Sequence, residues 1–257
     1  FVLGHTSTGP FGRGSFASRT SFFMAHAAIG GCKIFSENCS KLVDDLGLET
    51  NASIAEIAKL AAQKGHAESL KATAQFIPEN VVAADDHGYG NIASAYTFAV
   101  HGACVKVDTL TGKTMIQQYW AAHDTGTVVN YQGAVGQVIG GVIQGIGMAL
   151  SETTAVAENG QLLNPGYLDD RVPTFPGMPN VDVHFAATFD KNGPMGAKTI
   201  GEPPVIPVVG CIANAIYDAV EERQYTLPMT PEQVWNSLNT KVKWVLLKAI
   251  LVKISSN

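Results

Sequence analysis

Charged residues are scarce in this sequence. Only 15% of its 257 residues are Asp, Glu, Lys or Arg, against about 25% in an ordinary domain. Lys and Arg number 17 and Asp and Glu number 22, which gives a formal net charge of −5. Such a chain is a poor nucleic-acid binder, because neutralising phosphates requires clustered Lys and Arg. We therefore expect no nucleic-acid partner and a surface partly covered by other chains.

Cysteine is also scarce, and its spacing excludes several kinds of cofactor site. The sequence has four cysteines and no Cys-x-x-Cys pair, and its seven histidines show no metal-binding spacing. It therefore lacks the pattern of a disulfide framework, a zinc site or an iron–sulfur site. The first residues lack the basic head and apolar run of a signal peptide. We expect reduced thiols in a cytoplasmic protein, with no metal ligand supplied directly by the chain.

We expect no apolar run to be long enough to span a membrane. The longest, Val135–Leu150, carries only Gln137 and Gln144 as polar side chains. A spanning helix needs about 20 apolar residues, so this pattern predicts a buried helix and no membrane span. Several glycines interrupt it, and each costs about 1 kcal/mol relative to alanine in a helix. We infer that this helix approaches another surface closely.

Helical patterns occur towards both ends of the chain. Apolar spacing predicts a helix over residues 21–46. Ser53 and Glu56 form a capping box that begins a second helix, which stops near Gly65. Two more helices are predicted, one over residues 204–222 and one after Thr230.

Strand patterns lie between these helices. Residues 98–108 and 114–124 flank the turn 109–112 and predict a hairpin. Strict alternation of apolar residues predicts a half-buried strand from Val181 to Phe189. Residues 66–95 are poorly patterned, and a subdivision of the chain is expected there. Separate hairpins and helices predict an α+β fold with mixed sheets and packed helices.

The first candidate site is a glycine-rich loop at the entry to the first helix, residues 12–20. Its glycines allow close approach of the backbone, and its hydroxyls, arginines and helix-start amides suit a phosphate or pyrophosphate. The spacing Gly12-x-Gly14-x-x-Ala17 imitates a dinucleotide fingerprint, although no strand–helix–strand unit surrounds it. An ordinary glycine-rich helix entry explains the composition equally well. The candidate binding residues are Gly14, Ser15, Phe16, Ala17, Ser18, Arg19 and Thr20.

The second and third candidates are Glu202 and Gln137. Glu202 is followed by two prolines just before the predicted helix, whose dipole would hold the carboxylate ionised as a proton acceptor. Gln137 lies in the most apolar predicted helix, where its amide must find a backbone or ligand partner. The alternatives are an ordinary acidic residue at a helix start and a satisfied core glutamine.

Three segments together resemble the C-terminal half of the molybdenum-binding subunit in the xanthine dehydrogenase, or molybdenum hydroxylase, family. They are the loop Gly14–Arg19, the run Asp124–Glu152 with its Gly-Gln-x-x-Gly-Gly sequence, and Gly196–Pro204 with its Gly-Glu-Pro-Pro sequence. Their order and spacing match the family over essentially all of residues 1–257. The resemblance implies the α+β fold of the family's second molybdenum-cofactor-binding domain.

The resemblance also implies roles for the three candidates. Glu202 matches the active-site general base, and Gln137 matches the glutamine that contacts the oxo group of the molybdenum centre. Residues 14–20 match the loop that holds the pterin and its dinucleotide phosphates. The implied cofactor is molybdopterin cytosine dinucleotide with molybdenum, which is held by the pterin dithiolene. Family members usually carry Gly in place of Thr199 and Pro in place of Tyr131.

The implied reaction is hydroxylation of an electron-poor carbon in a nicotinate- or purine-like N-heteroaromatic ring, with water as the oxygen source. Electrons would pass to iron–sulfur clusters and FAD in partner chains. The expected partners are the upstream half of the molybdenum-binding subunit, an iron–sulfur subunit and an FAD subunit, as in nicotinate dehydrogenase-type enzymes. The chain starts at Phe1 and is interpreted as a split subunit or a piece of a single-chain relative. Alternatives are an aldehyde-oxidising or CoA-thioester-reducing member, a non-catalytic scaffold subunit, and a simple dinucleotide-binding domain.

Overall fold

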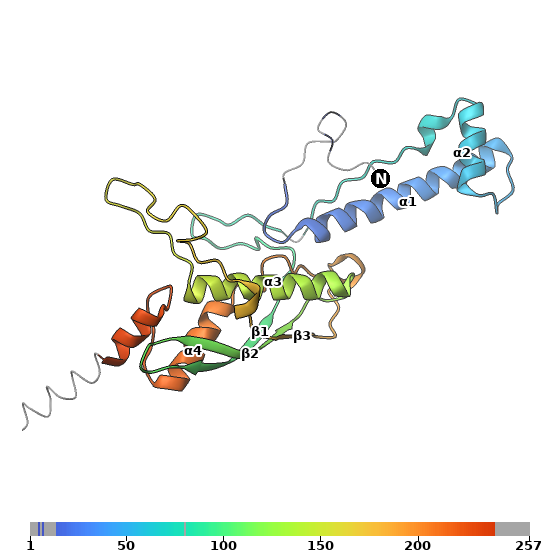
Figure 1. Ribbon diagram of the computed structural model, residues 1–257. Coiled ribbons are helices and arrows are strands. Elements are labelled where there is room, and N and C mark those ends of the chain that lie inside the picture. Colours follow the sequence, from blue (N-terminus) through green and yellow to red (C-terminus); the bar gives the residue numbers. More distant parts are fainter. Residues whose placement is uncertain (1–4, 6, 8–13, 80, 240–257) are drawn as a thin grey trace, which may run out of the picture. The chain divides into compact units, whose positions relative to one another are not determined.

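The chain folds into two compact units in a computed structural model (Figure 1). The first unit comprises residues 1–96 and 189–199, and the second comprises 97–188 and 200–257. The boundary between the units, after residue 96, lies at the end of the weakly patterned stretch 66–95. No sequence signal indicated that residues 189–199 belong to the first unit. The structure describes residues 5, 7, 14–79 and 81–239.

The first unit is built mainly from helices. Helix α1 spans Thr20–Leu46, α2 spans Ile54–Gln63, and a 3₁₀ turn, η1, follows at Ala67–Leu70. The predicted capping box is confirmed, because Ser53 Oγ accepts from the Glu56 N–H at 3.3 Å and the Glu56 carboxylate accepts from the Ser53 N–H at 2.8 Å. Local sequence signals therefore located both helices correctly.

Two small clusters stabilise this unit. Leu42, Leu46, Ile57 and Ala61 are buried where α1 and α2 pack together. Near the start of α1, aromatic rings of the helix contact Phe76 from the segment after η1. The third 3₁₀ turn, η3 (Pro194–Gly196), also contacts α1, so that the stretch 189–199 completes the unit.

The second unit consists of a three-stranded sheet with helices on one face (Figure 1). Strands β1 (Ala99–Val107) and β2 (Thr114–His123) form the predicted antiparallel hairpin. Strand β3 (Val181–Phe185) pairs with β2 in parallel, which gives the order β1-β2-β3. A 3₁₀ turn, η2 (Phe175–Gly177), lies just before β3. The mixed sheet and packed helices confirm the predicted α+β class.

The third strand is shorter than the alternation of apolar residues predicts. β3 ends at Phe185, and Phe189 is exposed and belongs to the first unit. Regular pairing stops there because β2, its partner, ends at His123, opposite Phe185. Alternation alone cannot show where a neighbouring strand stops.

Helices α3 (Tyr131–Leu150) and α4 (Val208–Val220) pack on the sheet face that carries Tyr119 and Ala121. Residues 231–239 form a further helical segment, whose predicted cap is present because Thr230 Oγ1 accepts from the Gln233 N–H at 3.3 Å. The shared core of these elements is Tyr119, Ala121, Val138, Val142, Ile146, Ala149, Val208, Ile212, Ile216, Met229 and Val234.

Helix α3 is longer than the sequence indicated. It has 20 residues because it begins at Tyr131 and not at Val135, so it is long and apolar enough to cross a membrane by length and composition. The expectation that it is too short was therefore wrong. In the fold, its residues Val138, Val142 and Ile146 are buried in the core of the second unit. Its opposite side, which includes Gln137 and Gly140, is exposed.

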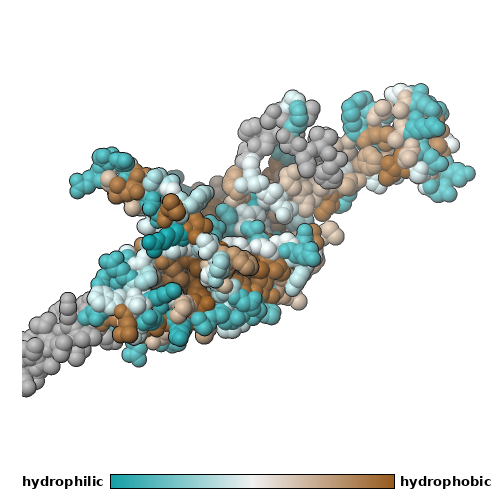
Figure 2. Space-filling model, viewed as in Figure 1, coloured by the Kyte–Doolittle hydropathy of each residue, from teal (hydrophilic) through white to brown (hydrophobic). Residues whose placement is uncertain are grey.

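Large hydrophobic side chains also lie on the surface, and Figure 2 shows hydrophobic patches among the polar residues. Three highly exposed examples belong to the irregular segment 151–178, between α3 and β3. Tyr167, Leu168 and Phe175 are 89%, 93% and 94% exposed. A chain with few charges thus leaves apolar surface uncovered.

Candidate active site

Helix α3 lies very close to the residues that lead into α4. A Cβ on Gly141 would lie 2.6 Å from the Pro204 Cβ, and one on Gly145 would lie 2.4 Å from the Val208 Cβ. Both separations are far below a carbon–carbon contact of about 3.5 Å. Glycine at these two positions therefore permits the close approach that the sequence predicted.

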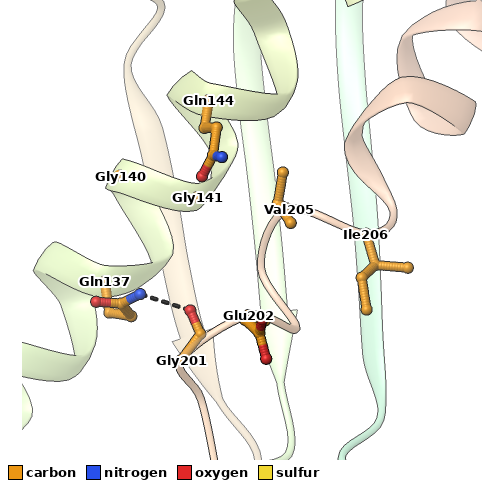
Figure 3. Close-up of a pocket in the computed structure, with 8 residues that line it drawn as sticks. All are labelled: Gln137, Gly140, Gly141, Gln144, Gly201, Glu202, Val205 and Ile206. Carbon is orange, nitrogen blue, oxygen red and sulfur yellow. Dashed lines mark hydrogen bonds between the residues drawn. The ribbon is translucent and has the colours of Figure 1, made fainter. Parts of the chain in front are cut away.

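A pocket of about 540 Å³ lies between α3 and residues 201–206 (Figure 3). Two of the predicted site residues, Gln137 and Glu202, line it from opposite elements, although 64 positions separate Gln137 from Gly201 in the chain. The lining residues are Gln137, Gly140, Gly141, Gln144, Gly201, Glu202, Val205 and Ile206.

The amide of Gln137 joins the two sides of this pocket. Its Nε2 donates a hydrogen bond of 2.5 Å to the carbonyl oxygen of Gly201, the residue before Glu202 (Figure 3). The predicted burial of Gln137 is wrong, since its side of α3 is exposed towards the pocket. The expected hydrogen bond is nevertheless present, and it fixes the backbone beside Glu202.

Glu202 lies in a series of tight turns. Its carbonyl oxygen accepts from the Val205 N–H at 3.1 Å, and the next turn is closed by the Ile206 N–H and the Pro203 carbonyl at 3.3 Å. The side chain is exposed and lines the pocket.

The predicted position of Glu202 directly before a helix is wrong. Helix α4 begins at Val208, six residues later, and not at Pro204. Pro207 explains the difference, because it has no N–H and its ring would clash with the carbonyl four residues earlier in a longer helix. The helix dipole acts only within about one turn. It therefore does not act on the Glu202 carboxylate.

The predicted cofactor loop lies in the first unit. Gly14, Ala17 and Ser18 have φ values of 86°, 50° and 55°, a left-handed conformation that is uncommon for residues other than glycine. Helix α1 starts immediately afterwards, at Thr20, without a side-chain cap or an acidic residue in its first turn. Helix-start N–H groups without a cap are anion-binding groups.

Arg19 adds a positive charge to this loop. Its guanidinium lies 3.9 Å from the centre of the Phe16 ring and donates a hydrogen bond of 3.4 Å to the carbonyl oxygen of Gly14. Together with the helix start, it fits a phosphate-bearing group. Gly12 and Arg13, which belong to the same predicted motif, lie outside the described residues.

One polar cluster in the second unit was not predicted. His101 Nδ1 lies 2.9 Å from the Tyr119 hydroxyl, and His101 Nε2 lies 2.9 Å from His123 Nε2. Burial, together with the neighbouring His123, lowers the pKa of His101 to about 4, and burial also lowers the pKa of His123. His101 is 18 positions from Tyr119 and 22 from His123, and only the pairing of β1 with β2 brings it to them. Among the described residues, no three His, Cys, Asp or Glu side chains gather as a metal site would require.

Gln144 is the other residue that sequence analysis did not assign to the site. It lines the pocket on the same side of α3 as Gln137. The signal was available in the spacing, because residues seven apart lie about two helical turns apart on one face.

Comparison with known proteins places the chain in a family. A family model described as the molybdopterin cofactor-binding domain matches residues 1–179. The putative xanthine dehydrogenase molybdenum-binding subunit of Escherichia coli K12 is 29% identical over 91% of this chain and 32% of its own length. The 6-hydroxypseudooxynicotine dehydrogenase complex subunit gamma of Paenarthrobacter nicotinovorans is 30% identical over 88% of this chain and 30% of its own length. The chain thus spans about a third of the length of these relatives.

Solved structures show the same fold. The aldehyde oxidoreductase of Desulfovibrio gigas superimposes with a TM-score of 0.74 at 27% identity, over 88% of this chain and 23% of that one. The quinoline 2-oxidoreductase of Pseudomonas putida 86 also gives a TM-score of 0.74, at 24% identity over 91% of this chain and 32% of that one. The chain therefore belongs to the molybdopterin cofactor-binding domains of the xanthine dehydrogenase, or molybdenum hydroxylase, family.

Proposed function

We propose that this chain carries the general base of a molybdenum hydroxylase that acts on an N-heteroaromatic substrate, with water as the oxygen source. The observation that carries the proposal is the pocket in which α3 and residues 201–206 bring Gln137 and Glu202 together. Names of two relatives support the substrate class: a quinoline 2-oxidoreductase and a nicotine 6-hydroxylase large subunit.

In this proposal Glu202 moves the proton. One carboxylate oxygen accepts a proton from the water-derived oxygen nucleophile that attacks the electron-poor carbon, which is general base catalysis. Gln137 holds the adjacent Gly201 carbonyl and so restricts where the carboxylate lies. Val205 and Ile206 provide an apolar wall against which a flat ring can pack. When bound, the molybdenum cofactor would supply the two-electron oxidation.

The loop before α1 would hold the dinucleotide part of the cofactor, for which we propose the cytosine form. The N–H groups at the start of α1 and the guanidinium of Arg19 are the donors that suit its phosphates. The left-handed backbone at Ala17 and Ser18 supports the same role, since strained conformations cluster at ligand-binding sites.

We further propose that the chain works with partners: the upstream half of the molybdenum-binding subunit, an iron–sulfur subunit and an FAD subunit. Three observations support this assembly. Two relatives are named as subunits, the four cysteines are dispersed and free, and large hydrophobic side chains are exposed on segment 151–178. Free cysteines also support a cytoplasmic location.

The test is the substitution Glu202→Gln in the assembled complex. It preserves the size of the side chain but removes the proton acceptor, so turnover should fall by about 10²- to 10⁴-fold while molybdenum content stays unchanged. The matched control is Glu158→Gln, which changes an exposed glutamate in segment 151–178 of the same unit. Turnover and metal content should both be normal in this control.

Two results would count against the proposal. Normal activity of the Glu202→Gln complex would remove Glu202 as the base. A native complex purified without molybdenum or pterin would instead favour a non-catalytic scaffold subunit.

A further inference from the structure

The second amide in the pocket, that of Gln144, has no part in the proton transfer described above. We infer that Gln144 determines substrate specificity by hydrogen-bonding an uncharged polar group of the substrate, at the end of the pocket away from Glu202. This inference rests on the proposed function, because it assigns a substrate class to the same pocket.

Gln144 lies at the end of the pocket away from Glu202 (Figure 3). Gln144 follows Gln137 by seven residues on α3, which corresponds to about 10 Å along the helix axis. Gln137 is hydrogen-bonded beside Glu202, so the base marks one end of the pocket and Gln144 marks the other (Figure 3). A ring system bound between them would meet the carboxylate with one edge and the Gln144 amide with another.

The surface between the two glutamines is bare helix backbone. Gly140 lies on it, and a Cβ there would have no atom within 4 Å. Val205 and Ile206 line the pocket from the segment that precedes α4. A flat surface with aliphatic side chains in the same pocket suits an aromatic ring, which needs contact on both faces.

The two amides differ in availability. Gln137 donates to the Gly201 carbonyl oxygen, whereas the side chain of Gln144 has no hydrogen-bond partner within the described part of the chain. A glutamine amide offers two N–H donors and one acceptor oxygen. It can therefore pair with a ring nitrogen, an oxo group or a carboxamide of a ligand.

Charge selects among these ligands. Of the described residues that line the pocket, Glu202 alone is charged, and none is Lys, Arg or His. An anionic substrate would approach this carboxylate without a compensating cation from these residues, and like charges repel each other. The pocket therefore favours a neutral heteroaromatic amide or oxo compound over a ring that carries a carboxylate.

The test compares two probes of the same size in the assembled, molybdenum-loaded complex: pyridine-3-carboxamide and pyridine-3-carboxylate. The wild-type complex should have the higher kcat/KM for the carboxamide. Gln144→Leu removes one neutral hydrogen bond, of about 0.5–1.5 kcal/mol, and should raise KM for the carboxamide by about 2- to 13-fold with little change in kcat. Gln144→Lys places an ammonium group that can pair with the carboxylate, and should shift the kcat/KM ratio of the two probes towards the carboxylate by up to about 5-fold.

The control variant is Gln132→Leu, an exposed glutamine on the same helix that does not line the pocket. It should leave both probes unaffected. Normal wild-type turnover with an unchanged KM in Gln144→Leu would overturn the inference about Gln144 alone. Loss of molybdenum from Gln144→Leu would overturn it as well, because the amide would then hold the cofactor. A loaded wild-type complex that hydroxylates neither probe would overturn the proposed function together with this inference.

Discussion

Replacing Gly145 with alanine should force α3 away from the start of α4. The new Cβ would lie 2.4 Å from the Val208 Cβ and 2.8 Å from each of its methyl carbons. Both residues are buried in the core of the second unit, so neither side chain can turn away into solvent. Overpacking of this kind typically costs about 1–3 kcal/mol. Alanine recovers about 1 kcal/mol of helix propensity, which leaves a net destabilisation of about 0–2 kcal/mol.

The matched control is Gly136→Ala on the same helix, where a Cβ would have no atom within 4 Å. This variant gains the helix propensity without the clash, so it should be more stable than the wild type by up to about 1 kcal/mol. The two variants should therefore differ by about 1–3 kcal/mol, the cost of the clash itself. For a chain of this size, 1 kcal/mol shifts Tm by about 2–4 °C.

The assay is thermal unfolding of the two variants under identical conditions, in the same assembled complex. Gly145→Ala should unfold about 2–12 °C below Gly136→Ala. It should also lower turnover, because the close packing of α3 holds Gln137 against the Gly201 carbonyl beside Glu202. Equal unfolding temperatures would refute the close packing of α3 on Val208, and with it the reason for the glycine at position 145.

Two further predictions concern stability. The free energy of unfolding should fall as the pH drops from about 6.5, the unfolded-state pKa of histidine, towards 4. The pKa of the half-buried His101 is lowered to about 4 in the folded chain, so over this range the unfolded chain binds an additional proton. In urea unfolding over that pH range, the free energy of unfolding should depend less on pH for His101→Gln than for the wild type. The control His87→Gln, which changes an exposed histidine, should show the wild-type dependence. Equal pH dependence in all three proteins would contradict the role of His101. Asn130→Ala should destabilise the chain by about 1 kcal/mol, because Asn130 Oδ1 caps α3 by accepting from the Gly133 N–H at 2.9 Å. Asn130→Asp keeps the acceptor, so urea midpoints that fall equally for both substitutions would show that the cap is not the cause.

Features that depend on neighbouring residues were predictable from the sequence. The capping box needs only Ser53 and Glu56, which are three positions apart, and the hairpin needs only two strands and the turn between them. Element ends that depend on a distant partner were not. The strand β3 stops where β2 stops. The start of α4 was also mispredicted, although its cause is local: Pro207, the residue directly before the helix, ends a series of turns.

In the candidate site, too, some features were predictable from the sequence and others were not. The residues that carry its chemistry were identified from motifs, because Gly-Gln-x-x-Gly-Gly and Gly-Glu-Pro-Pro are continuous in the chain. Their surroundings were mispredicted: Gln137 is exposed towards a pocket, and Glu202 lies six residues before its helix. Motifs specify residue types, whereas exposure depends on which elements pack beside them.

The amino-acid sequence by itself determined the helices, the hairpin, the fold class and the family of this protein, because each depends on local spacing or on continuous motifs. Only the tertiary structure decided that Gln137 reaches the Gly201 carbonyl, that Gln144 shares their pocket, and that His101 meets His123. His101 and His123 are 22 positions apart in the chain, and Gln137 and Gly201 are 64 positions apart. Such pairs form through strand register and through helix packing at glycines, which are properties of the folded chain and not of any short segment.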